Sequence, residues 1–342
     1  MREVYLGIDV GSVSTKVVVL GTGGEVLTGC YLKTGGQPIL AIQEGLALAV
    51  KAVGSGVKVL GCGATGSGRR LAAAVAGADV VKNEITAHAV AAQWREPGVQ
   101  TILEIGGQDS KIIVLRQGVV TDFAMNSVCA AGTGSFLDRQ AARLGVPIEQ
   151  FGDLALKSKN PVRIAGRCAV FAESDMIHKQ QIGQAVEDIV HGLCQALVRN
   201  YLSNVGKGKD IQAPVLFQGG VAANRGIVRA FEEALGCEVN VPEHYEVMGA
   251  IGSALLAMEE RKAALPSVFR GFNVAEASYK ASGFECRGCA NSCEIVRIYM
   301  DGEEVGCWGS KCGKWNLGSR RSKEAIPVEL GTEGQAAVGA EH

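Results

Sequence analysis

The sequence has almost no net charge and no long hydrophobic run, and each absence argues against a class of protein. The formal net charge is −1, which argues against a general nucleic-acid binder or a membrane-surface protein. No apolar stretch approaches the length that spans a bilayer. The first residues, MREVYLGIDVG, run straight into a predicted strand and lack the anatomy of a signal peptide. We therefore expect a cytoplasmic protein with neither nucleic acid nor membrane as a partner.

Glycine and cysteine, by contrast, are plentiful. Glycine accounts for 46 of 342 residues without any period, so many turns and close backbone approaches are expected. Eleven cysteines in a cytoplasmic protein indicate metal or redox use rather than structural disulfides. Five of the eleven crowd together near the C-terminus. Four of the scattered ones are interpreted as buried small apolar residues: Cys30, Cys62, Cys194 and Cys237.

Two stretches of the chain repeat one plan. Residues 6–29, LGIDVGSVSTKVVVLGTGGEVLTG, predict a strand, a glycine turn after an acid, and a strand hairpin. Residues 103–123, LEIGGQDSKIIVLRQGVVTDF, follow the same plan, and aligning Lys16 with Lys111 gives an offset of 95 residues. The continuous runs KVVVL and KIIVL are typical of strands buried on both faces. The repeat predicts two related α/β halves.

Helical periodicity fills the segments around these hairpins. We predict helices over 38–53 and 83–94, a helix in SFLDRQAARLG, one long helix over about 169–204, and an amphipathic helix ending near Leu265. Residues 214–236, PVLFQGGVAANRGIVRAFEEALG, predict a strand, a glycine turn and a helix.

Three glycine elements follow apolar strands: DVGSVSTK, EIGGQDSK and FQGGVAANRG. A single one of them is usually a plain tight turn, but three in one chain favour loops that cradle phosphates with backbone amides. Asp9 and Glu104 end their strands at matching places, and we predict that they serve catalysis by holding Mg²⁺ through water. Hydroxyls and the Lys16 charge would face the phosphates. The predicted nucleotide-binding residues are Gly11, Ser12, Ser14, Thr15, Lys16, Gly106, Gly107, Gln108, Asp109, Gly132, Thr133, Gly134, Gly219, Gly220 and Asn224.

Five motifs carry a family resemblance: NEITAHA, EIGGQDSK, NSVCAAGTGSFLDRQA, GRCAVFAESDMIH and FQGGVAANRG. They resemble the ATP-dependent activators of 2-hydroxyacyl-CoA dehydratases, often named with the benzoyl-CoA reductase ATPase subunits, within the acetate kinase, sugar kinase, Hsp70 and actin superfamily. The resemblance covers about residues 3–262. It implies two RNase H-like halves with ATP or ADP and Mg²⁺ in the cleft between them. The implied function is ATP-driven transfer of a low-potential electron.

The resemblance also divides the chain. We expect a first RNase H-like half over 1–86, completed by a returning helix at about 245–262, and a second half over 87–244. A cysteine-rich metal-binding module would follow over 266–318. Residues 319–342 are expected to form a flexible tail.

Cys129 and Cys168 each lie just before a predicted helix and beside glycine. A thiolate near a helix N-terminus is electrostatically favoured. Two cysteines cannot complete a 4Fe-4S site, whereas a C2 dimer doubles every ligand at its axis. The family resemblance implies this arrangement, with one 4Fe-4S cluster bridging a homodimer and two cysteines from each subunit. ATP-driven closing of the halves would then reorient the helices that begin at the two cysteines.

The C-terminal cysteines stand in the spacing C-x2-C-x3-C, then a strand, an Asp-Gly turn, a second strand and C-x4-C. This spacing predicts a metal site, with zinc and a second iron–sulfur cluster both open. Five candidate ligands leave one spare, and the first two and last two best fit a zinc ribbon. The candidates are Cys286, Cys289, Cys293, Cys307 and Cys312.

The partner and the class of function keep alternatives. Longer relatives with a cysteine-rich addition resemble reductases that serve double-cubane cluster proteins, so the acceptor is a double-cubane cluster protein or a 2-hydroxyacyl-CoA dehydratase, with ferredoxin or flavodoxin as donor. A sugar or acetyl kinase of the same superfamily would be colourless and would leave Cys129 and Cys168 without a role. A nucleotide-switched binding protein would need a peptide-binding or filament-forming region, which the sequence does not clearly show.

Overall fold

The computed structural model describes residues 1–260 and 266–315. These residues form two compact units. The first unit contains Met1–Glu84 and the described residues from Gly249 onward. The second unit is Ile85–Met248. Among the described helices, none is long and apolar enough to cross a membrane.

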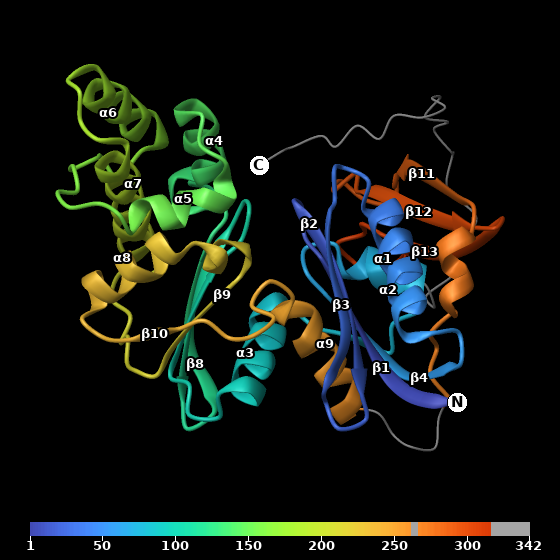
Figure 1. The fold of residues 1–342 in the computed structure, drawn as a ribbon. Coiled ribbons are helices and arrows are strands. Elements are labelled where there is room, and N and C mark those ends of the chain that lie inside the picture. The colour runs from blue at the N-terminus through green and yellow to red at the C-terminus, as the bar shows by residue number, and fades with distance from the viewer. Residues whose placement is uncertain (261–265, 316–342) are drawn as a thin grey trace. The chain divides into compact units, whose positions relative to one another are not determined.

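The first unit is built on a five-stranded sheet in the order β3-β2-β1-β4-β5 (Figure 1). Its strands are β1 (Arg2–Val10), β2 (Ser14–Gly21), β3 (Val26–Lys33), β4 (Val57–Thr65) and β5 (Val80–Val81). The first three pair antiparallel, while β4 runs parallel to β1 and to β5. Its helices are α1 (Pro38–Val53), α2 (Arg69–Ala76) and α9 (Met248–Glu260).

The second unit repeats this design in the order β10-β9-β6-β7-β8. Its strands are β6 (Thr101–Ile105), β7 (Ser110–Arg116), β8 (Val119–Asn126), β9 (Val215–Gln218) and β10 (Val239–Asn240). Again three strands pair antiparallel, and the strand that begins the hairpin pairs parallel with a later one. The two sheets confirm the two α/β halves predicted from the repeated hairpins.

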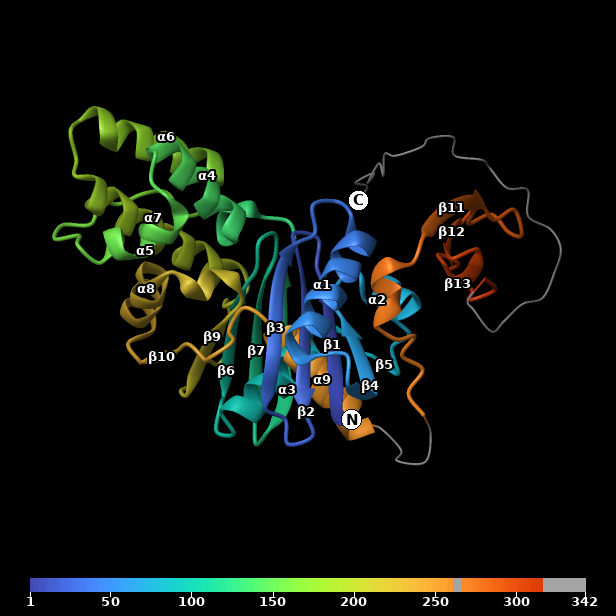
Figure 2. The same ribbon diagram turned by 45° about the vertical axis from the view of Figure 1, so that its right-hand side comes forward.

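Helices of the second unit gather at one end of its sheet (Figure 2). They are α4 (Gly134–Leu144), α5 (Ile148–Ala155), α6 (Ala169–Gln181) and α7 (Val186–Asn204), joined by α3 (Glu84–Arg95) and α8 (Arg225–Leu235) elsewhere in the unit. Two 3₁₀ turns, η1 (Ala130–Gly132) and η2 (Gly220–Ala223), precede α4 and α8. Phe151, Tyr201, Phe217 and Phe231 fill the core, with edge-to-face ring contacts around Phe231.

One predicted helix is wrong. The sequence predicts a continuous helix over 169–204, but the chain breaks between α6 and α7. Gly183 there has φ +76°, a left-handed conformation that ends a helix at little cost for glycine. The helix predicted to end near Leu265 starts at Met248, and residues 261–265 lie outside the described residues.

Helix α9 packs closely on the first sheet because glycines stand beneath it. A side chain at Gly7 would collide with the Ala250 carbonyl oxygen, and one at Gly63 with that of Ser253. The sequence drew attention to Gly249 and Gly252 on the helix. The contacts instead show the space being made by the strands.

The C-terminal part of the first unit is a three-stranded antiparallel sheet of β11 (Tyr279–Glu285), β12 (Glu294–Met300) and β13 (Glu303–Trp308), preceded by the 3₁₀ turn η3 (Phe272–Glu276). Asp301 and Gly302, both with positive φ, join β12 to β13, which confirms the predicted hairpin. The predicted tail over 319–342 lies outside the described residues.

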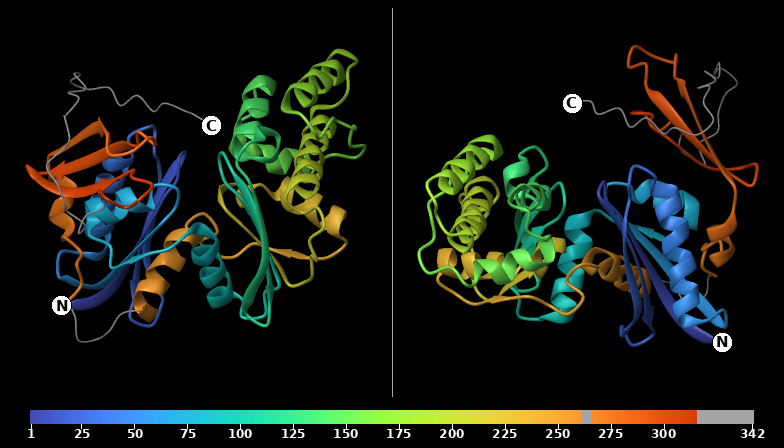
Figure 3. Two further views of the ribbon diagram at one scale, coloured as in Figure 1. Left: turned by 180° about the vertical axis from the view of Figure 1, so that it is seen from behind. Right: turned by 45° about the horizontal axis from the view of Figure 1, so that its top comes forward.

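This small sheet lies against α1 and α2 and shares their core (Figure 3). Val274, Ile298, Met300 and Val305 belong to the same buried cluster as the apolar residues of β1 and α1. The buried Gln43 of α1 donates from Nε2 to the carbonyl oxygens of Val274 and Ala277, at 2.9 and 2.7 Å. The C-terminal sheet is therefore part of the first unit's core.

Candidate functional site

Each unit presents the same acid–lysine hairpin. In the first unit Asp9 stands opposite Lys16, with Oδ2 and Nζ 3.1 Å apart. In the second unit Glu104 stands opposite Lys111, with Oε2 and Nζ 3.0 Å apart. The repeat noticed in the sequence thus extends to side-chain pairing.

The turns between these partners also match. Gly11 N–H donates to the Ser14 carbonyl oxygen, and Gly106 N–H donates to that of Asp109, both at 2.9 Å. The two bonds lie 95 residues apart in sequence, as the hairpins do. One turn geometry therefore serves both predicted phosphate loops.

The pair in the second unit is the more deeply buried. The side chains of Lys111 and Glu104 are 2% and 6% exposed, and Lys111 Nζ also lies 2.9 Å from Asp109 Oδ1. Buried charges persist only when they are paired. The Mg²⁺ contact predicted for Asp9 and Glu104 stays a prediction.

A glycine with positive φ covers each acid from the neighbouring parallel strand. Gly219, with φ +91°, leaves room for only 2.9 Å between a built Cβ and Glu104 Oε1. Gly66, with φ +93°, stands in the same relation to Asp9 Oδ1, at 2.6 Å. The sequence analysis missed Gly66. The signal for it was a glycine directly after the apolar strand VKVLGCGAT.

Within the second unit, three predicted nucleotide segments come together. Gly134 N–H donates to the Gly106 carbonyl oxygen and Ser135 N–H to that of Gly107, both at 2.9 Å. A side chain at Gly134 would lie 3.1 Å from Val221 Cγ2 in η2. The loops around 106, 133 and 220 therefore form one glycine-rich surface whose backbone a ligand can approach closely.

Other predicted nucleotide residues differ in what they contact. The Thr15 hydroxyl bonds that of Thr34 and is fully buried, whereas Ser12 and Gln108 are exposed. Asn224 caps α8, its Oδ1 accepting from Gly226 N–H and Ile227 N–H. Asn224 Nδ2 is buried and has no hydrogen-bond partner among the described residues, so it remains available to a ligand.

Cys129 and Cys168 occupy equivalent places. Each is the residue at which a helical segment begins, η1 in one case and α6 in the other, and each is partly exposed. Asn200 of α7 connects them: its Nδ2 lies 2.6 Å from the Gly166 carbonyl oxygen and 3.7 Å from Cys129 Sγ. The two cysteine loops are therefore neighbours on the end of one buried carboxamide.

The surroundings of these two cysteines suit an iron–sulfur cluster shared with a second chain. The neighbouring Val128, Val170 and Phe171 are 95%, 68% and 66% exposed. Two partly exposed thiols on adjacent loops supply half of the four thiolates that a 4Fe-4S cluster takes. The donor set therefore fits a cluster completed from outside this chain.

The scattered cysteines differ from this pair. Cys62 and Cys194 are fully buried, as predicted, and burial raises the pKa of each thiol far above its ordinary value. Cys30 and Cys237 are only partly buried, so that part of the prediction is wrong. Cys30 nonetheless donates from Sγ to the Val17 carbonyl oxygen at 3.4 Å, and burial also raises its pKa.

The C-terminal cysteines are partly gathered. Cys286 and Cys307 are buried in one cluster with Cys293 against them, while Cys289 and Cys312 are exposed. Hydrogen bonding by Trp315 and by Gly288 N–H lowers the pKa of Cys286, helped by the Lys314 charge. Within residues 1–260 and 266–315, however, no three His, Cys, Asp or Glu side chains form a group that could hold a metal ion. The C-terminal metal stays a prediction.

Two sheets of one strand order, each with an acid–lysine hairpin and glycine turns, define an actin-like ATPase fold. The chain belongs to the BadF/BadG/BcrA/BcrD ATPase family, whose profile matches residues 6–257. This confirms the predicted family. The C-terminal sheet lies outside the matched residues.

Among its relatives is the (R)-2-hydroxyglutaryl-CoA dehydratase activating ATPase of Acidaminococcus fermentans, 36% identical over 261 residues, which cover 75% of this chain and 97% of that protein. The crystal structure of component A of that dehydratase matches with a TM-score of 0.69 and 35% identity, covering 77% of this chain and 99% of that one. The activator of 2-hydroxyisocaproyl-CoA dehydratase from Clostridium difficile, solved with bound ADPNP, matches with a TM-score of 0.68 and 33% identity, covering 75% and 95%.

Proposed function

We propose that this protein is an ATP-hydrolysing reductase component that delivers low-potential electrons from a bridging 4Fe-4S cluster of a homodimer to an iron–sulfur partner protein. The observation that carries the proposal is the junction at Asn200. There two partly exposed cysteines lie on adjacent loops, and one of those loops continues into the glycine-rich surface of the second unit.

Nucleotide binding is the better supported half of the proposal. Membership in an ATPase family is consistent with ATP hydrolysis, and a relative was solved with bound ADPNP. The amides around Gly107 and Gly134 would bind phosphate oxygens, because no Cβ blocks the approach. Asp9 and Glu104 would hold Mg²⁺ through water.

The chain offers a physical route from nucleotide to cysteine. Gly132, Thr133 and Gly134 directly follow the turn that Cys129 begins, and a built Cβ at Gly132 would lie 2.7 Å from Asn200 Oδ1. Asn200 also holds the loop that precedes Cys168. A shift of the 132–134 loop on nucleotide binding would therefore move both cysteine loops together, provided that ATP and ADP prefer different positions.

The half-set of thiolates and the apolar residues beside it support a homodimer. Val128, Val170 and Phe171 are exposed in the single chain, and a second copy related by a two-fold axis would cover them while adding the two missing cysteines. When bound, the cluster supplies one-electron chemistry at low potential. The protein's own residues hold it, exclude water from it and set its surroundings.

The partners follow from the relatives and from the extra C-terminal sheet. Relatives of this chain are activators of 2-hydroxyacyl-CoA dehydratases and a benzoyl-CoA reductase subunit. We propose a double-cubane cluster protein or a 2-hydroxyacyl-CoA dehydratase as acceptor, and ferredoxin or flavodoxin as donor. A small-molecule kinase would leave the Cys129–Asn200–Gly166 junction without a role.

Iron analysis of anaerobically purified protein tests the proposal. We expect about four irons per dimer at this site, beyond any iron bound by the C-terminal cysteines. Cys129→Ser and Cys168→Ser should each lose that iron and weaken the dimer, because one substitution removes two ligands at the axis. Cys237→Ser, another partly exposed cysteine of the same unit, is the matched control. Full iron content in Cys129→Ser would disprove the cluster assignment.

A further inference from the structure

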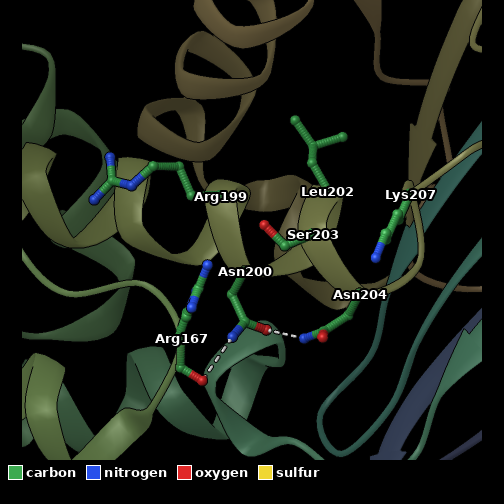
Figure 4. A pocket seen from close by; sticks show the side chains of 7 residues that line it. All are labelled: Arg167, Arg199, Asn200, Leu202, Ser203, Asn204 and Lys207. Carbon is green, nitrogen blue, oxygen red and sulfur yellow. Dashed lines mark hydrogen bonds between the residues drawn. The ribbon is translucent and has the colours of Figure 1, made fainter.

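A concave pocket of about 770 Å³ opens beside the cysteine pair, in the second unit (Figure 4). Its wall is the last part of α7, the residue before Cys168 and the loop after α7. Asn200 joins the Arg167 carbonyl oxygen and Asn204 across its floor. The lining residues are Arg167, Arg199, Asn200, Leu202, Ser203, Asn204 and Lys207.

The pocket carries positive charge that no carboxylate balances. Arg167, Arg199 and Lys207 are exposed and form no ion pair in the described part of the chain, and no acidic residue lines the pocket. Cations close by in sequence differ: Lys209 pairs with Asp122 at 2.7 Å, and Arg116 with Asp210 at 2.8 Å. Burial and the like charge of Arg163 lower the pKa of Arg199. The pocket is therefore a place for negative charge from another molecule.

Its position relates this charge to the cysteines. Arg167 directly precedes Cys168, and Asn200, which lines the pocket, lies 3.7 Å from Cys129 Sγ. Only one side chain thus separates the pocket from a cluster thiolate. Because electron transfer slows steeply with distance, a redox centre docked here would be well placed to exchange electrons with that site.

We infer that this basic pocket is the docking site for an acidic electron-carrier protein that reduces the iron–sulfur site. The inference rests on the proposed function. The reduced carrier loses one electron, and the electron passes to the group held by Cys129 and Cys168. No bond forms or breaks, and no proton moves. Charge complementarity suits such short-lived encounters, since it raises the association rate without requiring a large interface.

Stopped-flow reduction by a reduced acidic ferredoxin tests the inference on the iron-loaded dimer. For Arg167→Glu with Lys207→Glu we expect the second-order rate constant at low salt to fall by about tenfold or more. The salt dependence should flatten, because the opposite charges are gone. Arg167→Gln with Lys207→Gln should show a smaller loss in the same direction. Lys157→Glu, an exposed lysine outside the pocket lining, is the matched control.

Three further measurements decide the outcome. Reduction by photoreduced deazaflavin, a small uncharged reductant, should not change in the variants, because it needs no charged docking site. An unchanged ferredoxin rate overturns the inference, and so does a variant that accepts electrons normally but fails only in passing them to the acceptor. Saturable binding of pyrophosphate that is lost in the variants, with ferredoxin unaffected, would make the pocket a small-anion site instead. A wild-type dimer without iron would sink the proposed function itself, a result distinct from any of these.

Discussion

Lys111 is the residue on which the second hairpin depends. Its ammonium is almost fully buried and lies within 3.0 Å of both Glu104 and Asp109. Its backbone carbonyl oxygen also accepts from the Tyr201 hydroxyl, at 2.6 Å. Strand pairing, a buried ion pair and the anchoring of α7 thus meet at one residue.

Lys111→Met should destabilise the second unit by roughly 3–5 kcal/mol, because it leaves a buried carboxylate without its partner. Combining it with Glu104→Gln should recover part of that loss. Lys58→Met, which breaks the exposed pair with Glu3, should cost at most about 1 kcal/mol. Urea unfolding followed by hydrogen exchange in β6 and β7 peptides reports on this unit. An equal, small loss in Lys111→Met and Lys58→Met would show that the buried pair is not structurally important.

Residue pairing was within reach of the sequence only where it is local. Asp9 with Lys16 and Glu104 with Lys111 follow from alternation along a hairpin. The contact of Asn200 with Cys129 joins residues 71 positions apart, and no periodicity predicts it. The same holds for Gly7 and Gly63, whose need for glycine comes from the backbone of α9.

Among the elements, regular ones were predicted and interrupted ones were not. The helix over 38–53 has the predicted bounds, because an apolar period of 3.6 residues runs through it without a break. The stretch over 169–204 has similar periodicity on both sides of Gly183, which hides the break. Helix α2 and strand β4 lie in a glycine-rich stretch, where the composition resembles that of a loop.

Helix α7 is fixed at its start by Asp188, which lies in the first turn. Asp188 Oδ1 accepts from Ser158 Oγ at 2.7 Å and from the backbone N–H groups of Lys159 and Asn160 at 3.0 and 2.9 Å. The Ser158 bond and then these amides lower the pKa of Asp188. The carboxylate thus holds the loop after α5 against α7.

The pKa of Asp188 is lower in the folded protein than in the unfolded chain, so its charge stabilises the fold above the ordinary value of about 3.9. That contribution should fade as the pH falls through the folded pKa. We expect Asp188→Asn to be less stable than the wild type near pH 7 and the difference to shrink below about pH 4. Unfolding midpoints of both proteins across this range check the prediction. A difference that grows on acidification would contradict the stated pKa direction.

On the scale of the whole molecule, the C-terminal sheet departs most from the sequence-based picture. Cysteine spacing suggested a small module held together mainly by metal. The structure instead places its apolar residues in the core of the first unit, through Val274, Ile298 and Met300. Such long-range packing cannot be predicted from local patterns, because any apolar strand could have provided the partner.

Ending the chain before Pro266 should therefore destabilise the first unit. Removal would uncover the apolar face of α1 and α2 and leave the buried Gln43 amide without its two carbonyl partners. We expect the unfolding temperature of this unit to fall by several degrees, since a loss of 1 kcal/mol shifts it by about 2–4 °C in a unit of this size. Iron at Cys129 and Cys168 should persist, because those cysteines belong to the separately packed second unit. Deleting only residues 319–342 is the control and should leave the unfolding temperature unchanged. Calorimetry with iron analysis separates the outcomes: loss of iron on truncation, with the second unit still folded, would mean that the C-terminal sheet helps to hold the cluster.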